Sequence, residues 1–297
     1  MTASLLPRLR TNDYLAYIAT LLAPSAKREA IAAVWCYSNE LALVPLTVQN
    51  TAAGEIRLQW WAEVVRGVRN EEGRGHPVGR VLLRTIDEFD LPREPLADMA
   101  EARSFDLYID PMPDGDAFEA YAGAVASVPI QVVSRILDAD AATRSAEAAG
   151  HAGVYQVVID RLWTLARDRA SGRSFLPSDV LLRAWTTPTE LTEQSFADQE
   201  RKTKALVEEL LAYADTHRAA FEAASTGLPP TLAPAFAAAN ARKVREKALR
   251  RSIPTLFGRS PNARPVAEQR EAMRTHRLFE TAPSTSLLGR LRKRLWS

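Results

Sequence analysis

Acidic side chains at helical spacing are the residues of this chain that could bind a divalent cation. Asp106 and Asp110 form a D-x-x-x-D pair in FDLYID, and residues four apart share one face of a helix. Two carboxylates on one face can hold a hard cation through oxygen. Asp110 belongs to the turn cluster DPMPDGD, so we expect turn or capping roles for this pair, not metal binding.

Three other acids stand inside helical stretches without a partner at that spacing. Glu40 is followed four residues later by Val44, and Asp160 and Asp168 are separated by Thr164 at the midpoint. None of these helical stretches therefore offers a cation two carboxylates four residues apart. We predict no metal site and no cofactor, with Glu40 and Asp168 as isolated acids.

Two further residues are candidates for ligand contact. Arg57 precedes Trp60 and Trp61 and could hold an anionic headgroup, although we expect the two tryptophans to be core residues. His151 lies between Gly150 and Gly153, where helices can approach closely, so it could face a cavity. A lone histidine is more often a hydrogen-bonded structural residue than a ligand.

Helical periodicity covers almost the whole chain, and Pro, Gly and Asp interrupt it at short intervals. We expect a loop at residues 70–75, a helix start at His76 and Pro77, and a kink at Pro129. The main expected helices cover residues 13–23, 26–44 (ended by Pro45), 54–69, 76–89, 94–108, 117–137, 141–169, 196–224 and 231–250.

The composition agrees with an all-α fold. Alanine, leucine, arginine and glutamate dominate, and hydrophobic residues make up 46% of the 297 residues. We find no strand-type alternation, no repeat and no glycine-rich phosphate loop. The single cysteine, Cys36, excludes an intramolecular disulfide and favours a reducing compartment. The first residues do not resemble a secretory signal, and no apolar run is long enough to predict a membrane span.

The net charge of +2 conceals a strong asymmetry. From Asn240 onward, 15 basic residues stand against 4 acidic ones. An amphipathic helix at 284–296 would present a basic face to an anionic membrane; a solvated terminus is an equally good interpretation. Nucleic-acid binding is not expected, because no motif accompanies the charge. The candidate membrane contacts are Leu288, Arg290, Leu291, Arg292, Lys293, Arg294 and Trp296.

Three segments together resemble the squalene and phytoene synthases, which are head-to-head prenyl transferases. They are AAVWCYSNELALV, GEIRLQWWAEVVRG and AGHAGVYQVVIDRLWTLARDRASGRSFLP, with EARSFDLYIDPMPDGDAFEAYAGAVASV between the second and third. The resemblance covers roughly residues 13–182. It implies an isoprenoid-synthase-type helical bundle around a central cavity, which Tyr121, Tyr155 and Gln156 would face.

The same resemblance implies two aspartate pairs that bind the diphosphate of the substrate through magnesium. Carried over, these positions fall on Glu40 and Val44, and on Thr164 and Asp168. A tyrosine that contributes to catalysis in the squalene synthases falls on Ala124. Removing one charge-stabilising group typically costs roughly 10²–10³ in rate. The departures therefore indicate a branch that kept the fold and lost the chemistry.

The amino-acid sequences of these segments also resemble those of bacterial relatives of the mitochondrial complex I assembly factors of this fold. That resemblance implies a binding role in respiratory complex assembly, in a cytoplasmic protein peripheral to the inner membrane, with a protein partner and with a lipid or isoprenoid in the cavity. The alternative is an active prenyl transferase that uses magnesium and farnesyl or geranylgeranyl diphosphate. We expect one helical domain over residues 1–252 and a basic appendage over 253–297.

Overall fold

The computed structural model describes residues 5–193, 200–252 and 265–275. Within these ranges the chain is helical and has no strand, apart from an isolated bridge between Met112 and Pro177. The expected amphipathic helix at 284–296 lies outside the described residues.

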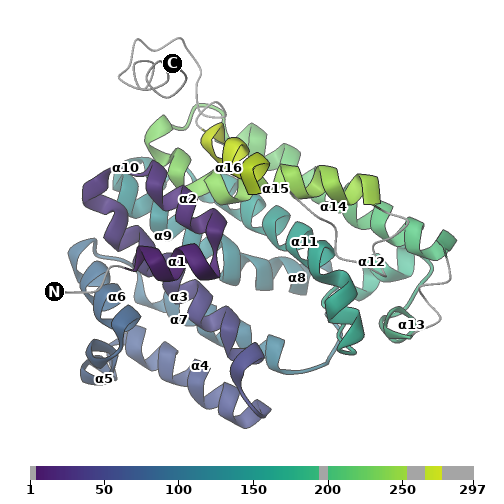
Figure 1. Ribbon diagram of the computed structural model, residues 1–297, viewed down its shortest axis with the longest axis horizontal. Helices are drawn as coiled ribbons and strands as arrows, with labels where there is room; N and C mark the ends of the chain where they lie inside the picture. The colour runs from purple at the N-terminus through teal and green to yellow at the C-terminus, as the bar shows by residue number, and fades with distance from the viewer. Residues whose placement is uncertain (1–4, 194–199, 253–264, 276–297) are drawn as a thin grey trace.

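The helices follow one another with short connections (Figure 1). The first half comprises α1 (Leu6–Asn12), α2 (Tyr14–Leu22), α3 (Arg28–Thr47), α4 (Thr51–Arg66), α5 (Asn70–Gly75), α6 (Pro77–Glu88), α7 (Arg93–Ala102), the 3₁₀ turn η2 (Arg103–Leu107) and α8 (Gly115–Ala122). The second half comprises the π turn η3 (Gly123–Ser127), α9 (Val128–Leu137), α10 (Ala139–Ala142), α11 (Ala146–Ala170), α12 (Ser178–Arg183), α13 (Pro188–Thr192), α14 (Glu200–Ser225), α15 (Ala233–Ser252) and α16 (Pro265–Met273).

Two long helices organise the bundle. Helix α3 packs against α6, α9 and α4, and α11 packs against α14 and α15 (Figure 1). Helix α15 also contacts α2 and α16, so the described part of the predicted appendage is attached to the main body. A hydrogen bond of 3.0 Å from Asn240 Nδ2 to the carbonyl of Glu271 fastens α16 to α15.

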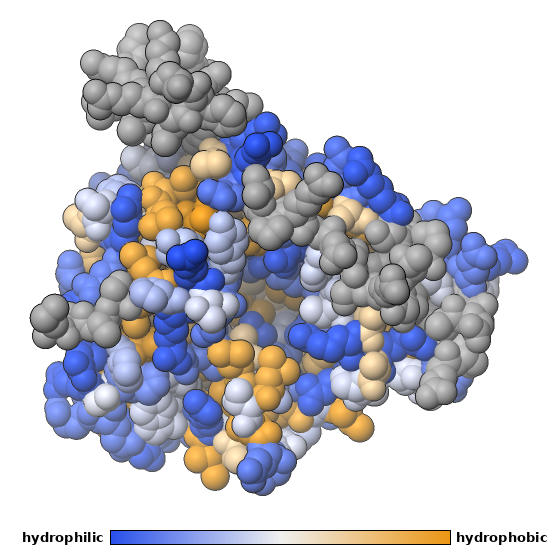
Figure 2. All heavy atoms as spheres, viewed as in Figure 1, coloured by the Kyte–Doolittle hydropathy of each residue, from blue (hydrophilic) through white to orange (hydrophobic). Residues whose placement is uncertain are grey.

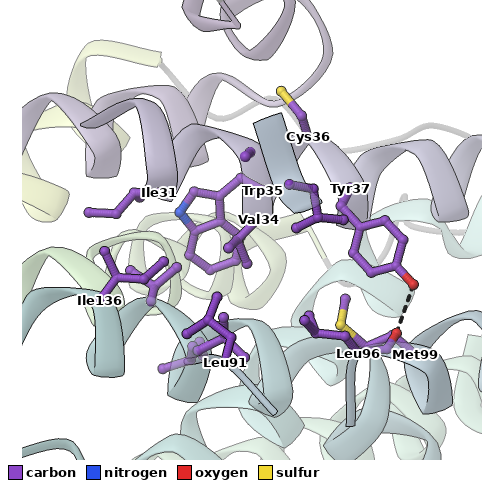
Figure 3. Packing of buried hydrophobic residues seen from close by; sticks show 14 of the residues in the cluster. Ile31, Val34, Trp35, Cys36, Tyr37, Leu91, Leu96, Met99 and Ile136 are labelled. Atoms are coloured by element: carbon purple, nitrogen blue, oxygen red, sulfur yellow. Dashed lines mark hydrogen bonds between the residues drawn. The ribbon is translucent and has the colours of Figure 1, made fainter. Parts of the chain in front are cut away.

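The core side of α3 is apolar and tightly filled. Figure 3 shows Ile31, Val34 and Trp35 facing Leu91, in the connection between α6 and α7, and Ile136 of α9. The hydroxyl of Tyr37 donates a 2.7 Å hydrogen bond to the carbonyl of Leu96, which satisfies the one polar atom of that buried ring. This packing fixes the rotation of α3 about its axis, and therefore decides which of its side chains face elsewhere.

Several local expectations are confirmed. The helix starts expected at residues 13 and 76 are found: Asp13 accepts a 2.9 Å hydrogen bond from the backbone of Ala16 at the start of α2, and His76 caps α6 ahead of Pro77. Gly153 lies where an added Cβ would be 2.6 Å from the backbone nitrogen of Ser127, so only glycine permits this approach of η3 to α11. Trp61 is fully buried, whereas Trp60 is half-buried.

Two expectations about helix boundaries are wrong. Helix α3 continues past Pro45 to Thr47, because a proline in the last turn removes one hydrogen bond without forcing the chain out of the helix. The expected loop at 70–75 is the short helix α5. The kink expected at Pro129 stays a prediction; the π turn Gly123–Ser127 interrupts the α-helix directly before Val128 and Pro129.

Two segments are long and apolar enough to cross a membrane by length and composition: Ser25–Thr47 and Gly115–Leu137. Most of each window is buried, 61% and 67% respectively. Core helices of a globular bundle pass the same test, so this is weak evidence for a membrane span.

Candidate functional site

A cleft of about 580 Å³ opens between α3, η3 and α11. Figure 2 shows this face hollowed near its centre, with hydrophilic side chains to the right of the hollow and hydrophobic side chains below it. The cleft is lined by Asp13, Ser38, Asn39, Ala42, Pro45, Leu46, Arg103, Asp106, Tyr121, Val125, Ala126, Gln156, Val157, Asp160, Arg161, Thr164, Arg167, Asp168, Ser171, Arg173, Phe175 and Arg242.

Asp106 is the centre of a buried polar cluster in this cleft. Its carboxylate accepts hydrogen bonds from Arg103 at 2.8 Å, from Arg161 at 2.9 Å and from the hydroxyl of Tyr121 at 2.8 Å. The guanidinium of Arg161 also lies 3.9 Å from the ring centroid of Phe175. Asp106 lies in the 3₁₀ turn η2 and is only 5% exposed, but it caps no helix, so of the expected turn or capping roles the capping role is wrong.

The arginines determine the charge state of this cluster. Burial opposes ionisation of Asp106, but the charges of Arg103 and Arg161 outweigh burial and hold its pKa below the usual value. Burial raises the pKa of Tyr121 to about 12, so this phenol stays protonated at neutral pH and can donate to Asp106. The cluster is therefore an ionised carboxylate between two guanidinium groups.

Asp160 is held by arginines from α15. Its carboxylate accepts hydrogen bonds from Arg242 at 2.7 and 3.0 Å, and from Arg245 at 2.9 Å. Burial would raise the pKa of Asp160, but the charges of these two arginines lower it overall. Because Arg242 is itself buried, its positive charge needs the Asp160 carboxylate as a counter-charge.

Asp168 also has its oxygens occupied. The hydroxyl of Thr164, one turn earlier on α11, donates a 2.6 Å hydrogen bond to Oδ2. Arg167 donates to Oδ1 at 3.1 Å, and Arg161 lies 4.0 Å from Oδ2. Thr164 therefore acts as a hydrogen-bond donor at a position where the family resemblance implies a carboxylate.

The wall contributed by α3 carries no charge. The residues of α3 that line the cleft are Ser38, Asn39, Ala42, Pro45 and Leu46. Glu40 is not among them: it is buried elsewhere and forms an ion pair with Arg8 of α1. Val44 is buried in the core. The packing of α3 therefore turns both predicted aspartate positions away from the cleft.

The residues of the cleft do not fit a magnesium clamp. Mg²⁺ needs carboxylate oxygens that are free to coordinate it, and each acid of the α11 wall is engaged by arginine. Within the described ranges, no group of three or more His, Cys, Asp or Glu side chains is arranged to hold a metal ion.

The sequence-predicted ligand residues are divided between the cleft and other places. Tyr121 and Gln156 line the cleft. Tyr155 is buried beside it and donates a 2.9 Å hydrogen bond to Glu246, and His151 contacts His217 with 3.1 Å between their Nδ1 atoms. Arg57 is exposed on α4, outside the cleft lining. Ligand contact by any of them stays a prediction.

Sequence reasoning missed the arginines and the role of Asp106. The i,i+3 spacing of Arg103 and Asp106 is a local signal that could have indicated their ion pair. No local signal links Asp160 to Arg242, because 82 residues separate them.

Comparison with known proteins identifies the family. Residues 9–278 match the squalene/phytoene synthase family model, so the chain belongs to this family. It is 23% identical over 228 residues to the bovine NADH dehydrogenase (ubiquinone) complex I assembly factor 6, covering 77% of this chain and 67% of that protein. The human protein of the same name is 22% identical over the same shares.

Solved structures of synthases share the fold. A dehydrosqualene synthase in complex with ligand superposes with a TM-score of 0.71 at 18% identity, covering 91% of this chain and 94% of that chain. A squalene synthase from Alicyclobacillus acidocaldarius gives a TM-score of 0.67 at 18% identity, over 84% and 92%. The all-α isoprenoid-synthase fold expected from the sequence is therefore confirmed.

Proposed function

We propose that this protein acts by binding, in the assembly of respiratory complex I, and does not transfer prenyl groups. The observation that carries the proposal is the state of the cleft acids. Asp106, Asp160 and Asp168 are each engaged by arginine, and the α3 wall contributes no acid. A carboxylate in such an ion pair could bind a cation only by leaving an arginine without its partner. The fourth acid of the lining, Asp13, caps α2 by accepting a hydrogen bond from the backbone of Ala16.

The leaving group sets the electrostatic requirement of prenyl transfer. Ionising a prenyl diphosphate requires positive charge fixed around the diphosphate as it departs. Magnesium held by paired carboxylates would supply it. With no such pair, several charge-stabilising groups are missing together, each worth about 10²–10³ in rate. We expect turnover indistinguishable from the uncatalysed reaction.

Similarity to the complex I assembly factors supports the assembly role. The partner would be a protein of the assembling complex, and the site of action the cytoplasmic side of the inner membrane. Membrane contact would come from the C-terminal segment 284–297, which contains four basic residues and no acidic one.

The enzymatic part is tested by incubating the full chain with farnesyl or geranylgeranyl diphosphate and magnesium, and measuring released diphosphate. We expect no release above background. Release that disappears in Asp168→Asn but persists in Glu40→Ala, whose side chain lies outside the cleft, would overturn the proposal and establish the prenyl transferase alternative.

The assembly part is tested by removing the gene from its host and measuring assembled complex I on native gels. We expect less complex I, restored by the wild-type gene. Unchanged complex I would contradict the assembly role.

Membrane contact is tested by sedimentation with vesicles of anionic phospholipid, using the full chain and a chain that ends at residue 283. We expect the shorter chain to bind less. Equal binding would remove the C-terminal segment from the proposal.

A further inference from the structure

A second groove lies on the outer side of the bundle, where α4 meets α7 and the 3₁₀ turn η2. Its volume is about 610 Å³, and it shares no lining residue with the central cleft. Helix α4 lies along the lower edge of the molecule in Figure 1. The groove is therefore a separate surface, which the acids and arginines of the cleft do not explain.

Direct contacts hold the two walls of the groove together. Arg66 of α4 lies 2.9 Å from Glu94 and 2.7 Å from Glu101, both on α7. Arg93, at the start of α7, donates a 2.7 Å hydrogen bond to the carbonyl of Val65 on α4. A groove with fixed walls needs little rearrangement to accept a binding partner.

The floor of the groove is apolar, and part of it is open to solvent. Leu58 and Ala100 are buried in the floor. Ile56 is 72% exposed, and Trp60 is half-buried, with its indole nitrogen donating a 2.8 Å hydrogen bond to Glu72. Tryptophan and exposed aliphatic side chains together are typical of surfaces that a protein partner covers.

The rim of the groove is acidic, because each of its two arginines pairs with two glutamates. Arg69 forms ion pairs with Glu63 and Glu72. Arg66 likewise pairs with the two glutamates of α7. Four carboxylates and two guanidinium groups leave two negative charges in excess.

Glu55 adds a carboxylate that has no basic partner. It accepts a hydrogen bond from the hydroxyl of Tyr108, and among the described residues no basic side chain lies within 4.0 Å of it. The exposed Arg57 of α4 is the one further charge beside the floor that we count. Five glutamates then stand against three arginines, so the groove keeps an excess of two negative charges.

The end of the chain has the opposite charge. Segment 284–296 contains four basic side chains and no acidic one. A helix formed by it would collect its apolar residues on one side, opposite the basic ones. These apolar residues are Leu287, Leu288, Leu291, Leu295 and Trp296. Such a helix is complementary to an apolar floor with an acidic rim, whereas an anionic lipid surface would be repelled by the rim.

We infer that the groove between α4 and α7 binds segment 284–296 of a second copy of this chain. The last described helix, α16, packs on α15 and α2, whereas α4 packs on α7, α3, η2 and α5. The two helices lie at opposite edges of the molecule in Figure 1, which is why we assign the segment to a second copy. The contact is then head-to-tail, with an amphipathic helix lying in a groove.

This contact goes beyond the proposed role in complex I assembly and does not depend on it. Segment 284–297 is also the proposed membrane contact, and one apolar helix face cannot cover the groove and enter a membrane at the same time. Anionic lipid should therefore release the segment from the groove.

The test is cross-linking of the full chain with a carbodiimide, followed by mass spectrometry. The reagent joins an amine and a carboxylate in direct contact as an amide, and takes up the water that is lost. Lys293 is the one lysine of the segment. In a mixture of unlabelled and isotopically labelled chains, we expect Lys293 joined to Glu55 or Glu63 of the other chain. Lys293→Arg is the control, because it keeps the charge and removes the reactive amine.

Two matched pairs of variants locate the contact, measured by fluorescence anisotropy of a labelled peptide of residues 284–297. Ile56→Ala should weaken peptide binding about fivefold, whereas Leu182→Ala, 61% exposed on α12, should leave it unchanged. Glu55→Gln should weaken it about threefold, the size of an exposed ion pair. Glu147→Gln, exposed on α11, should leave it unchanged. Thermal unfolding establishes that the four variants are folded.

Vesicles of anionic phospholipid should lower the yield of the Lys293 cross-link, and vesicles of neutral phosphatidylcholine should not. A cross-link that stays within one chain would overturn the assignment to a second copy. No cross-link to a groove glutamate, or unchanged peptide affinity of Ile56→Ala, would overturn the groove as the binding site. If the cross-link is absent while loss of the gene still lowers assembled complex I, this contact fails and the proposed function stands.

Discussion

The two helical walls of the cleft lack a magnesium clamp for different reasons. On α3, the cleft side carries Ser38, Asn39 and Ala42, and the nearest acid, Glu40, is turned away and paired with Arg8. On α11, acids are present, but arginines and Thr164 occupy their oxygens. One wall is uncharged, and the other is charged and internally neutralised.

Substitutions on the two walls should differ in how much they lower the free energy of unfolding. Polar residues on the α3 wall can change at little cost, because no buried charge depends on them. On the α11 side, each carboxylate balances a buried or half-buried arginine, and removing it would leave that arginine uncompensated. The α11 side is therefore expected to be sensitive to substitution and the α3 side tolerant.

The largest expected effect is that of Asp106→Ala. It leaves Arg103 and Arg161 without their shared carboxylate, and breaking a buried ion pair on one side costs roughly 3–5 kcal/mol. Urea denaturation measures the change. The control Asp110→Ala, at an exposed turn residue, should stay within about 0.5 kcal/mol. Equal stability of the two variants would refute the interpretation that Asp106 balances these two arginines.

Acid should remove the same stabilisation. The folded-state pKa of Asp106 lies below the unfolded value of about 4, so the contribution is complete above that value and is lost as pH falls through the folded-state pKa. The difference in unfolding free energy between wild type and Asp106→Ala should therefore be constant from pH 7 to 5 and shrink below about pH 4. Denaturation curves at pH 7, 5, 4 and 3 measure it. A difference that grows in acid would contradict the ion-pair interpretation.

Thr164→Val should have an intermediate effect. It keeps the shape of the side chain but removes the 2.6 Å hydrogen bond to Asp168, and a hydrogen bond to a charged group is worth about 1.5 kcal/mol. Urea denaturation again gives the value. An unchanged urea midpoint would mean that only the arginines stabilise the Asp168 carboxylate. The difference between the α3 and α11 walls would then rest on ion pairs alone.

The smallest expected effect is that of Ser38→Ala on the α3 wall. The hydroxyl faces the cleft and supports no buried charge, so we expect a change within about 0.5 kcal/mol. A loss above 1 kcal/mol in the same denaturation measurement would show that the α3 wall is less tolerant than proposed.

Local sequence signals located most of the helices. The periodicity of residues 13–23 and the His76–Pro77 pair predicted α2 and the start of α6, because caps and periodic apolar residues act over one or two turns. The expectations that failed concern helix ends: Pro45 lies in the last turn of α3 and does not end the helix, and residues 70–75 form the short helix α5.

The sequence by itself determined the all-helical fold, the family resemblance and the absence of acid pairs at four-residue spacing on the two clamp helices. Only the tertiary structure decided which side chains meet in the cleft. A shift of one residue along a helix turns a side chain by about 100°, so matching segments could not settle where Glu40 points. The partners of the Asp106 and Asp160 carboxylates come from as far as 55 and 85 residues away, and such contacts exist only after the helices have packed.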